Sequence, residues 1–239
     1  MIEAVIFDFG QTLVDSANGF RAAEKEVQRK IFSDLFSICD IGSPEIFLDV
    51  YRLVRKKNQD ESIFSRIVIW QALYRHYNAE PDLHRFENWE TSYWEKVKTE
   101  TKIFPETQQV LRNLAASYRL ALITNTQGQK ITESHRLSQY PELEKFFEVI
   151  IVAGQGDVPP KPDPEPFRLC LKNLGLTSSE AVYVGDDWRI DICGAKDAGL
   201  SAVWLKHHSV HRNWPTVETS IPIVTSLKQL LDLDEVLQQ

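Results

Sequence analysis

Five short apolar runs that do not alternate with polar residues constrain the fold of this chain more than any other feature. They are AVIF at 4–7, LALI at 120–123, VIIVA at 149–153, AVYV at 181–184 and AVWL at 202–205. Continuous apolar runs of this length are typical of strands buried on both faces of a parallel sheet. Helical segments begin near Pro105 and Asp163, between the runs. This order of strands and helices predicts an α/β fold, a doubly wound Rossmann-like parallel sheet.

Residues 17–100 follow a different pattern and predict a helical insertion. The segment has no strand-like run, and its apolar residues recur at steps of three and four, the spacing of a buried helix face. We therefore divide the chain into an α/β core domain, residues 1–16 and 101–239, and an α-helical domain, residues 17–100. Most aromatic residues of the insertion are interpreted as its core, and basic residues such as Arg66 as a solvated helix face.

Composition limits the classes of partner. The formal net charge of −7 over 239 residues disfavours nucleic acid and anionic membranes, which bind through excess Lys and Arg. An anionic ligand would therefore need a locally positive pocket. We find neither a signal-peptide pattern nor an apolar run of about 18 residues, the length that spans a bilayer, and expect a cytoplasmic protein. The sequence does not indicate an oligomeric state.

Three histidines stand close together in KHHSVHRNWP, residues 206–215. No acidic residue lies beside them in the sequence. We therefore interpret this stretch as a surface loop in preference to a metal site.

Polar residues whose side chains can bind a ligand or take part in a reaction follow four of the apolar runs. They are Asp8 after the first run, Thr124 and Asn125 after the second, Lys161 in the loop after the third, and Asp186, Asp187 and Asp191 after the fourth. The carboxyl ends of parallel strands face one common crevice, where ligands bind in open α/β sheets. We therefore expect these side chains to converge.

The expected cluster has the composition of a magnesium and phosphate site. Asp8, Asp186 and Asp191 offer the hard oxygen ligands that Mg²⁺ prefers. The hydroxyl, amide and ammonium groups of the other two sets offer hydrogen-bond donors and positive charge to phosphate oxygens. A carboxylate held against such a phosphate can attack phosphorus in line and form an aspartyl phosphate.

Taken together, the four stretches resemble the motifs of the haloacid dehalogenase-like hydrolase superfamily. DFGQT is similar to the first motif, DxDxT, at Asp8 and Thr12 but has Gly10 at the second acidic position. LALITN resembles the second motif, KPDPEPF the third through Lys161, and VGDDWRIDICGA the fourth. The insertion at 17–100 resembles the helical cap of that superfamily's first cap class.

The resemblance implies a role for each matching residue and a small phosphorylated metabolite as substrate. It implies that Asp8 is the nucleophile and that Thr124 and Lys161 also take part in catalysis. It implies that the substrate is bound by Thr12, Thr124, Asn125 and Lys161. It implies that Mg²⁺ is ligated by Asp8, Asp186, Asp191 and the backbone carbonyl of Gly10. A participation of Asp187 in metal binding stays open.

Gly10 leaves two functions open. In phosphatases of the superfamily the second aspartate acts as the general acid and base, a contribution of about 10² to 10⁴ in rate. The chain is therefore interpreted as a slow magnesium-dependent phosphatase or, alternatively, as a catalytically weakened relative that binds a phosphate ligand or a protein. Dehalogenases also lack that aspartate, but the acids retained in GDDWRID favour phosphoryl chemistry. A positive φ at Gly10 is also considered, since glycine tolerates that conformation.

Overall fold

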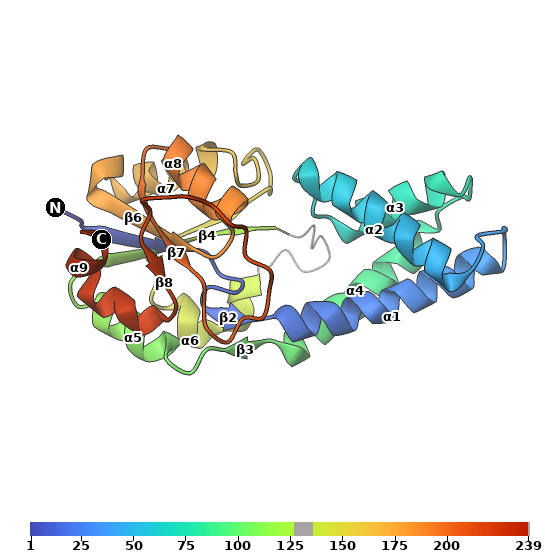
Figure 1. Cartoon of the computed structure of the whole chain (residues 1–239), viewed down its shortest axis with the longest axis horizontal. Coiled ribbons are helices and arrows are strands. Elements are labelled where there is room, and N and C mark those ends of the chain that lie inside the picture. Colours follow the sequence, from blue (N-terminus) through green and yellow to red (C-terminus); the bar gives the residue numbers. More distant parts are fainter. Residues whose placement is uncertain (127–135, 239) are drawn as a thin grey trace. The chain divides into compact units, whose positions relative to one another are not determined.

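The chain forms two compact units in a computed structural model that describes residues 1–126 and 136–238 (Figure 1). The first unit contains Met1–Asp15, Lys102–Asn125 and the described residues from 136 onward. The second contains Ser16–Thr101 and Thr126. The first unit is the α/β fold that the apolar runs predict, and the second is helical.

A parallel sheet forms the centre of the first unit. Its strands, in spatial order, are β5 (Val149–Ala153), β4 (Arg119–Asn125), β1 (Ala4–Phe7), β6 (Ala181–Gly185), β7 (Ser201–Leu205) and β8 (Ile223–Val224). Every neighbouring pair is parallel. All five apolar runs are strands, as predicted. Strands β2 (Val14–Asp15) and β3 (Lys102–Ile103) form a separate antiparallel pair.

Both faces of this sheet are buried, which explains why its strands read as continuous apolar runs. In β1, Val5 and Phe7 belong to the core on one face, whereas Ala4 and Ile6 belong to the core on the other. Successive side chains of a strand point to opposite faces, so both must be apolar when helices cover both. Strand β1 lies between β4 and β6, and its four residues are fully buried.

Helices cover both faces of the sheet. One face carries α5 (Thr107–Leu114), α6 (Pro141–Glu144) and α9 (Leu233–Val236), and the other carries α7 (Glu165–Leu174) and α8 (Gly194–Asp197). Helix α7 shows why these segments are helical: Phe167, Cys170, Leu171 and Leu174 line one buried stripe. Gly175 ends it in the left-handed conformation, with φ +68°.

The second unit is built from four helices: α1 (Ala17–Phe36), α2 (Pro44–Asp60), α3 (Arg66–His76) and α4 (Leu83–Glu100). Polar residues cap three of them, since Ser43, Ser65 and Asp82 each accept a hydrogen bond from a first-turn backbone N–H. The aromatic side chains at helical spacing form the core, as predicted, with Trp70 fully buried.

Arg66 does not lie on a solvated helix face, contrary to the interpretation from the sequence. The residue is 3% exposed, and its guanidinium lies over the rings of Tyr93 and Trp94. The carboxylate of Glu24, itself buried, accepts hydrogen bonds from Tyr51 and Tyr93 close to it. A charged residue can be buried when aromatic faces and a carboxylate replace its water, and helical periodicity alone does not reveal such partners.

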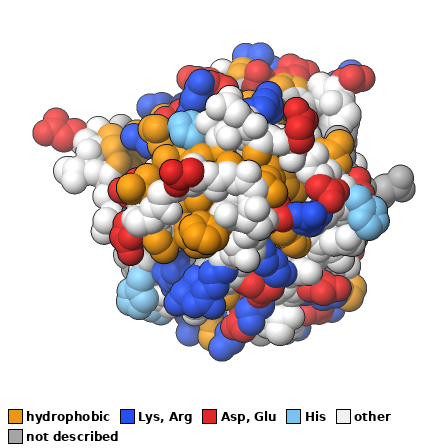
Figure 2. All heavy atoms as spheres, turned by 90° about the vertical axis from the view of Figure 1, so that its right-hand side faces the viewer, with side chains coloured by type: hydrophobic (Ala, Val, Ile, Leu, Met, Phe, Trp, Pro, Cys, Tyr) orange, Lys and Arg blue, Asp and Glu red, His pale blue; other side chains and the backbone are white. Residues whose placement is uncertain are grey.

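Acidic, basic and hydrophobic side chains are interspersed on the face shown in Figure 2. Basic side chains gather at the lower left of that view, but neither sign of charge covers the face. Within the described residues, no helix has both the length and the apolar composition needed to cross a bilayer.

Candidate active site

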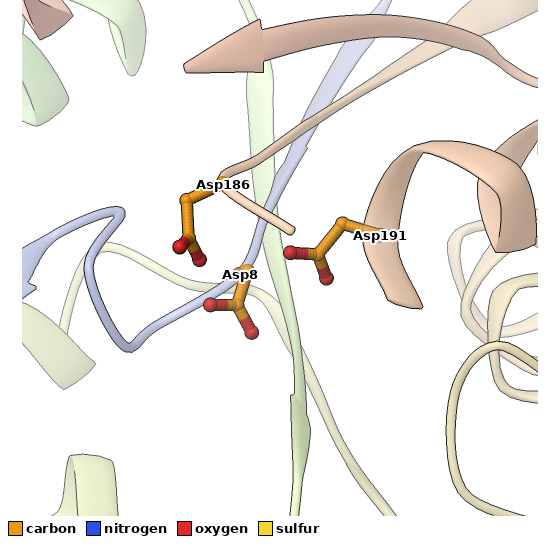
Figure 3. Close-up of side chains that lie close together, drawn as sticks. All are labelled: Asp8, Asp186 and Asp191. Carbon is orange, nitrogen blue, oxygen red and sulfur yellow. The ribbon is translucent and has the colours of Figure 1, made fainter. Parts of the chain in front are cut away.

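Three aspartates meet at the carboxyl ends of the central strands, as the sequence predicts. Asp8 directly follows β1, Asp186 directly follows β6, and Asp191 lies in the π-helical turn η3 (Trp188–Cys193). One carboxylate oxygen from each lies within 4.8 Å of those of the other two, and all three residues are buried. Figure 3 shows the three carboxylates pointing toward a common space.

Lys161 joins two of these aspartates. Its ammonium nitrogen, on a side chain that is 1% exposed, donates to Asp8 Oδ1 at 2.8 Å and to Asp191 Oδ1 at 2.7 Å. It also lies 2.9 Å from the carbonyl oxygen of Ile123 and 2.8 Å from the Tyr183 hydroxyl. A lysine is rarely buried this deeply unless it is paired, so these contacts fix its position.

Burial and an excess of carboxylates over cations determine the pKa values of the cluster. Burial raises the pKa of Asp191 to about 6, although Lys161 opposes the shift. Burial and the charges of Asp191 and Asp8 raise the pKa of Asp186 well above its ordinary value. Burial would lower the pKa of Lys161, but the two carboxylates outweigh it and hold that pKa above its ordinary value. The site is therefore short of positive charge.

The turn after β6 brings Asp191 back toward the sheet. Asp187 caps the turn by accepting a hydrogen bond from Ile190 N at 2.9 Å, and its own N–H donates to Asp191 Oδ2 at 2.9 Å. Gly185 leaves room for this arrangement, because a Cβ there would lie 2.5 Å from Asp191 Cβ. Asp187 itself is not one of the three clustered acids.

The first motif folds into a tight turn with its strained residue at Gln11. Gln11 has φ +61°, whereas Gly10 is not among the residues with positive φ, so the left-handed position is one residue later than we considered. Gln11 N donates to Val14 O at 2.8 Å and closes the turn. Thr12 is fully buried, and its Oγ1 has no hydrogen-bond partner within residues 1–126 and 136–238.

The second predicted set lies at the end of β4. The side-chain amide of Asn125 donates to Lys161 O at 3.0 Å and accepts from Lys161 N at 2.8 Å. Asn125 therefore positions the lysine loop. Thr124 is 6% exposed at the same strand end. The roles of both residues in phosphate binding stay predictions.

Arg212 is a charged neighbour of the site that the sequence did not indicate. Its guanidinium donates to Asp186 Oδ2 at 2.5 Å and to Asp187 Oδ2 at 3.2 Å. It comes from an irregular segment 26 residues beyond Asp186, and no motif or periodicity marks it. Tyr183 was missed for another reason, because it is part of an apolar run; its hydroxyl donates to Asp191 Oδ1 at 3.1 Å.

Residues 206–215 form the mostly exposed loop that the sequence predicts, but the His207 side chain within it is buried. The residue is 2% exposed, its Nε2 lies 3.0 Å from Glu106 Oε1, and its ring stacks on Phe104. The backbone N–H of Ser209 points to Nδ1 at 3.3 Å, so Nδ1 accepts and Nε2 carries the proton given to Glu106. The acidic partner lies 101 residues away in the sequence.

The donor set of the aspartate cluster fits a magnesium ion. Three buried carboxylates supply the hard oxygens that this ion prefers. Burial and the charges of Asp191 and Asp8 raise the pKa of Asp186, and a divalent cation would offset those charges.

Comparison with known proteins agrees with this architecture. A family model described as a haloacid dehalogenase-like hydrolase matches residues 2–199. Phosphoglycolate phosphatase from Salmonella typhi is 30% identical over 213 residues, which cover 86% of this chain and 82% of that protein. Glyceraldehyde 3-phosphate phosphatase from Pyrococcus abyssi is 25% identical over 210 residues, covering 87% of this chain and 82% of that protein.

A solved structure agrees over the full length. The crystal structure of 2-haloacid dehalogenase from Pseudomonas syringae pv. Tomato DC3000 matches with a TM-score of 0.68 and 25% identity, covering 100% of this chain and 99% of that one. The match and the fold thus define an α/β hydrolase, and the candidate site lies at the carboxyl ends of its strands. The chain belongs to the haloacid dehalogenase-like hydrolase family.

Proposed function

We propose that this protein is a magnesium-dependent phosphatase that acts on a small phosphorylated metabolite through an aspartyl phosphate at Asp8. The observation that carries the proposal is the buried cluster of Asp8, Asp186 and Asp191, in which the Lys161 ammonium binds Asp8 and Asp191. A nucleophilic carboxylate, a fixed cation and metal-binding oxygens are the groups that phosphoryl transfer requires. The similar phosphatases are named for glyceraldehyde 3-phosphate and phosphoglycolate, both small phosphorylated metabolites.

In the proposed reaction the Asp8 carboxylate attacks phosphorus. A bond forms between the carboxylate oxygen and phosphorus as the bond to the alcohol oxygen breaks, and the departing oxygen takes a proton from solvent water. A second water then attacks phosphorus and breaks its bond to the Asp8 oxygen, which releases phosphate, restores the Asp8 carboxylate and returns a proton to the solvent. Lys161, held by Asn125 through its backbone, keeps Asp8 in place. Thr12 and Thr124 are proposed to contact the phosphate together with these two residues.

A magnesium ion would be held by Asp8, Asp186, Asp191 and the Gly10 carbonyl, and would neutralise charge that develops on the phosphoryl oxygens. Asp187 is left outside this ligand set, since its carboxylate caps the turn after β6 and pairs with Arg212.

Gly10 sets the expected efficiency of both steps. It has no side chain to protonate the alcohol or to activate the water. The proposal therefore favours substrates whose leaving oxygen is already acidic, such as aryl and acyl phosphates. The same feature supports the second candidate, a weakened family member that binds a phosphate ligand or a protein without turnover.

The test is a panel of phosphorylated metabolites and aryl phosphates assayed with Mg²⁺ for released phosphate. We expect turnover by the parent protein and none by Asp8→Asn, because an amide is neither a nucleophile nor a charged ligand. Asp187→Asn is the matched control and should retain turnover, since an amide oxygen still caps the turn.

Two other results would redirect the proposal. Magnesium-dependent binding of phosphate without turnover of any ester would support the weakened binder. Halide release from 2-haloacids in the presence of a chelator would contradict phosphatase chemistry and favour the activity of the similar dehalogenase.

A further inference from the structure

The segment between β7 and β8 brings a cation to the aspartate cluster. Residues 206–222 contain neither a helix nor a strand. Trp214 is partly buried against both cores of the α/β unit and anchors the segment. Arg212 lies two residues before this anchor, with its guanidinium 4.7 Å from the centre of the Trp214 ring. The tryptophan thus holds the arginine within reach of the site.

Arg212 is bonded directly to a residue of the proposed metal site. Its Nη1 donates to Asp186 Oδ2 at 2.5 Å, and its Nη2 donates to Asp187 Oδ2 at 3.2 Å. The Asp186 side chain is 6% exposed, whereas that of Arg212 is 34% exposed. Arginine keeps its charge at every ordinary pH, so the pair is not released by deprotonation of its donor.

Asp186 can pair more favourably with one cation than with two at the same time. Asp8 and Asp191 already share the Lys161 ammonium, whereas Asp186 has Arg212 as its ion-pair partner. A metal ion ligated by Asp186 would stand close to the guanidinium, and two cations on one carboxylate repel each other. The bond to Asp187 offers the guanidinium an alternative position without leaving the site.

We propose that Arg212 is a tethered cation that competes with magnesium for Asp186 and is displaced onto Asp187 when the metal binds. This inference rests on the proposed metal site. Arg212 would balance the carboxylates when magnesium is scarce and would set the magnesium concentration at which the site fills. The apparent dissociation constant rises by the reciprocal of the fraction of molecules in which Asp186 is released.

The proposal is tested by calorimetric titration of the full-length protein with Mg²⁺ alone. Arg212→Gln should bind Mg²⁺ about fivefold more tightly than the parent, the change expected when a partly exposed ion pair no longer has to open. Arg212→Lys keeps the charge on a shorter side chain without the planar fork and should lie between the two.

Lys206→Gln is the matched control for loss of charge. Lys206 belongs to the same segment, and its ammonium lies 3.8 Å from the centre of the Trp204 ring. A general electrostatic effect would tighten binding in Lys206→Gln as much as in Arg212→Gln and would fade with added salt. Direct competition predicts a change of less than about twofold in Lys206→Gln.

A second readout follows the arginine itself. Displacement of Arg212 alters its contact with Trp214, so Mg²⁺ should change the tryptophan emission of the parent. That change should be reduced in Arg212→Gln and in Trp214→Phe, although both variants still bind the metal.

The outcomes separate the inference from the metal site on which it rests. Unchanged or weaker Mg²⁺ binding by folded Arg212→Gln and Arg212→Lys would overturn the competition and make Arg212 a positioning residue for Asp186. Absence of Mg²⁺ binding by the parent and by every variant would overturn the proposed metal site, and the inference with it.

Discussion

Replacement of Lys161 by methionine should destabilise the α/β unit more than almost any other single change of a charged residue. The substitution preserves length and removes the charge that Asp8 and Asp191 share, leaving two carboxylates in a buried site. Removing one partner of a buried ion pair costs about 3–5 kcal/mol. For a chain of this size that loss lowers Tm by about 6–20 °C.

The loss should depend on pH in a direction set by the carboxylates. The pKa of Lys161 is above its ordinary value, so its stabilisation is complete throughout pH 5–8 and would be lost only at more alkaline pH. In the variant, Asp191 loses the Lys161 charge that opposes the upward shift of its pKa. Ionisation of a carboxyl group with a raised folded-state pKa opposes folding. The destabilisation should therefore be larger at pH 8 than at pH 5, below the pKa of about 6 for Asp191 in the parent.

Thermal melts of three variants at both pH values, without metal, provide the assay. Lys161→Met combined with Asp191→Asn should recover part of the loss at pH 8, because one uncompensated charge is removed with its partner. Lys172→Met, at an exposed position in the last turn of α7, should change stability by less than about 0.5 kcal/mol. A Lys161→Met variant that melts within about 2 °C of the parent at pH 8 would refute the reasoning.

Three further substitutions probe the motif turns. Gly10→Asp should raise turnover of alkyl phosphates by up to about 10² to 10⁴ in steady-state assays, because it restores an acid and base side chain. Gly10 has no positive φ, so the backbone can accept aspartate. No gain in a variant that folds and binds Mg²⁺ would mean that another group already acts as the acid and base. Gln11→Gly should raise the free energy of unfolding by about 1 kcal/mol in urea titrations, since φ is +61° there; a loss of stability would contradict this. Gly185→Ala should cost about 1–3 kcal/mol and weaken Mg²⁺ binding, because the new Cβ would overlap Asp191; unaltered metal binding would show that the turn can shift at no cost.

The sheet could be predicted because burial on both faces leaves a direct trace in the sequence. Strands β1 and β5 have the same limits as the runs AVIF and VIIVA. Strand β8 was missed because only two residues of it pair, and two residues show no pattern. The strands β2 and β3 are equally short.

The sequence predicted which aspartates form the site, but it did not predict every residue that contacts them. Parallel strands deliver their carboxyl ends to one edge, so convergence of Asp8, Asp186 and Asp191 followed from topology. Arg212 reaches Asp186 from an irregular segment, where position depends on tertiary packing around Trp214. The strained residue was misplaced by one, to Gly10, because a tight turn fixes its φ angles through hydrogen bonds that the sequence does not display.

The most direct test of an aspartyl-phosphate mechanism is rapid acid quenching of the parent protein with Mg²⁺ and an aryl phosphate, followed by peptide mass spectrometry. We predict a mass gain of one phosphoryl group on Asp8 that appears as a burst, because without an acid–base side chain at Gly10 hydrolysis of the intermediate is slow. Phosphate release at the full steady-state rate with no phosphorylated Asp8 at any quench time, or with the phosphoryl group on another residue, would contradict the mechanism.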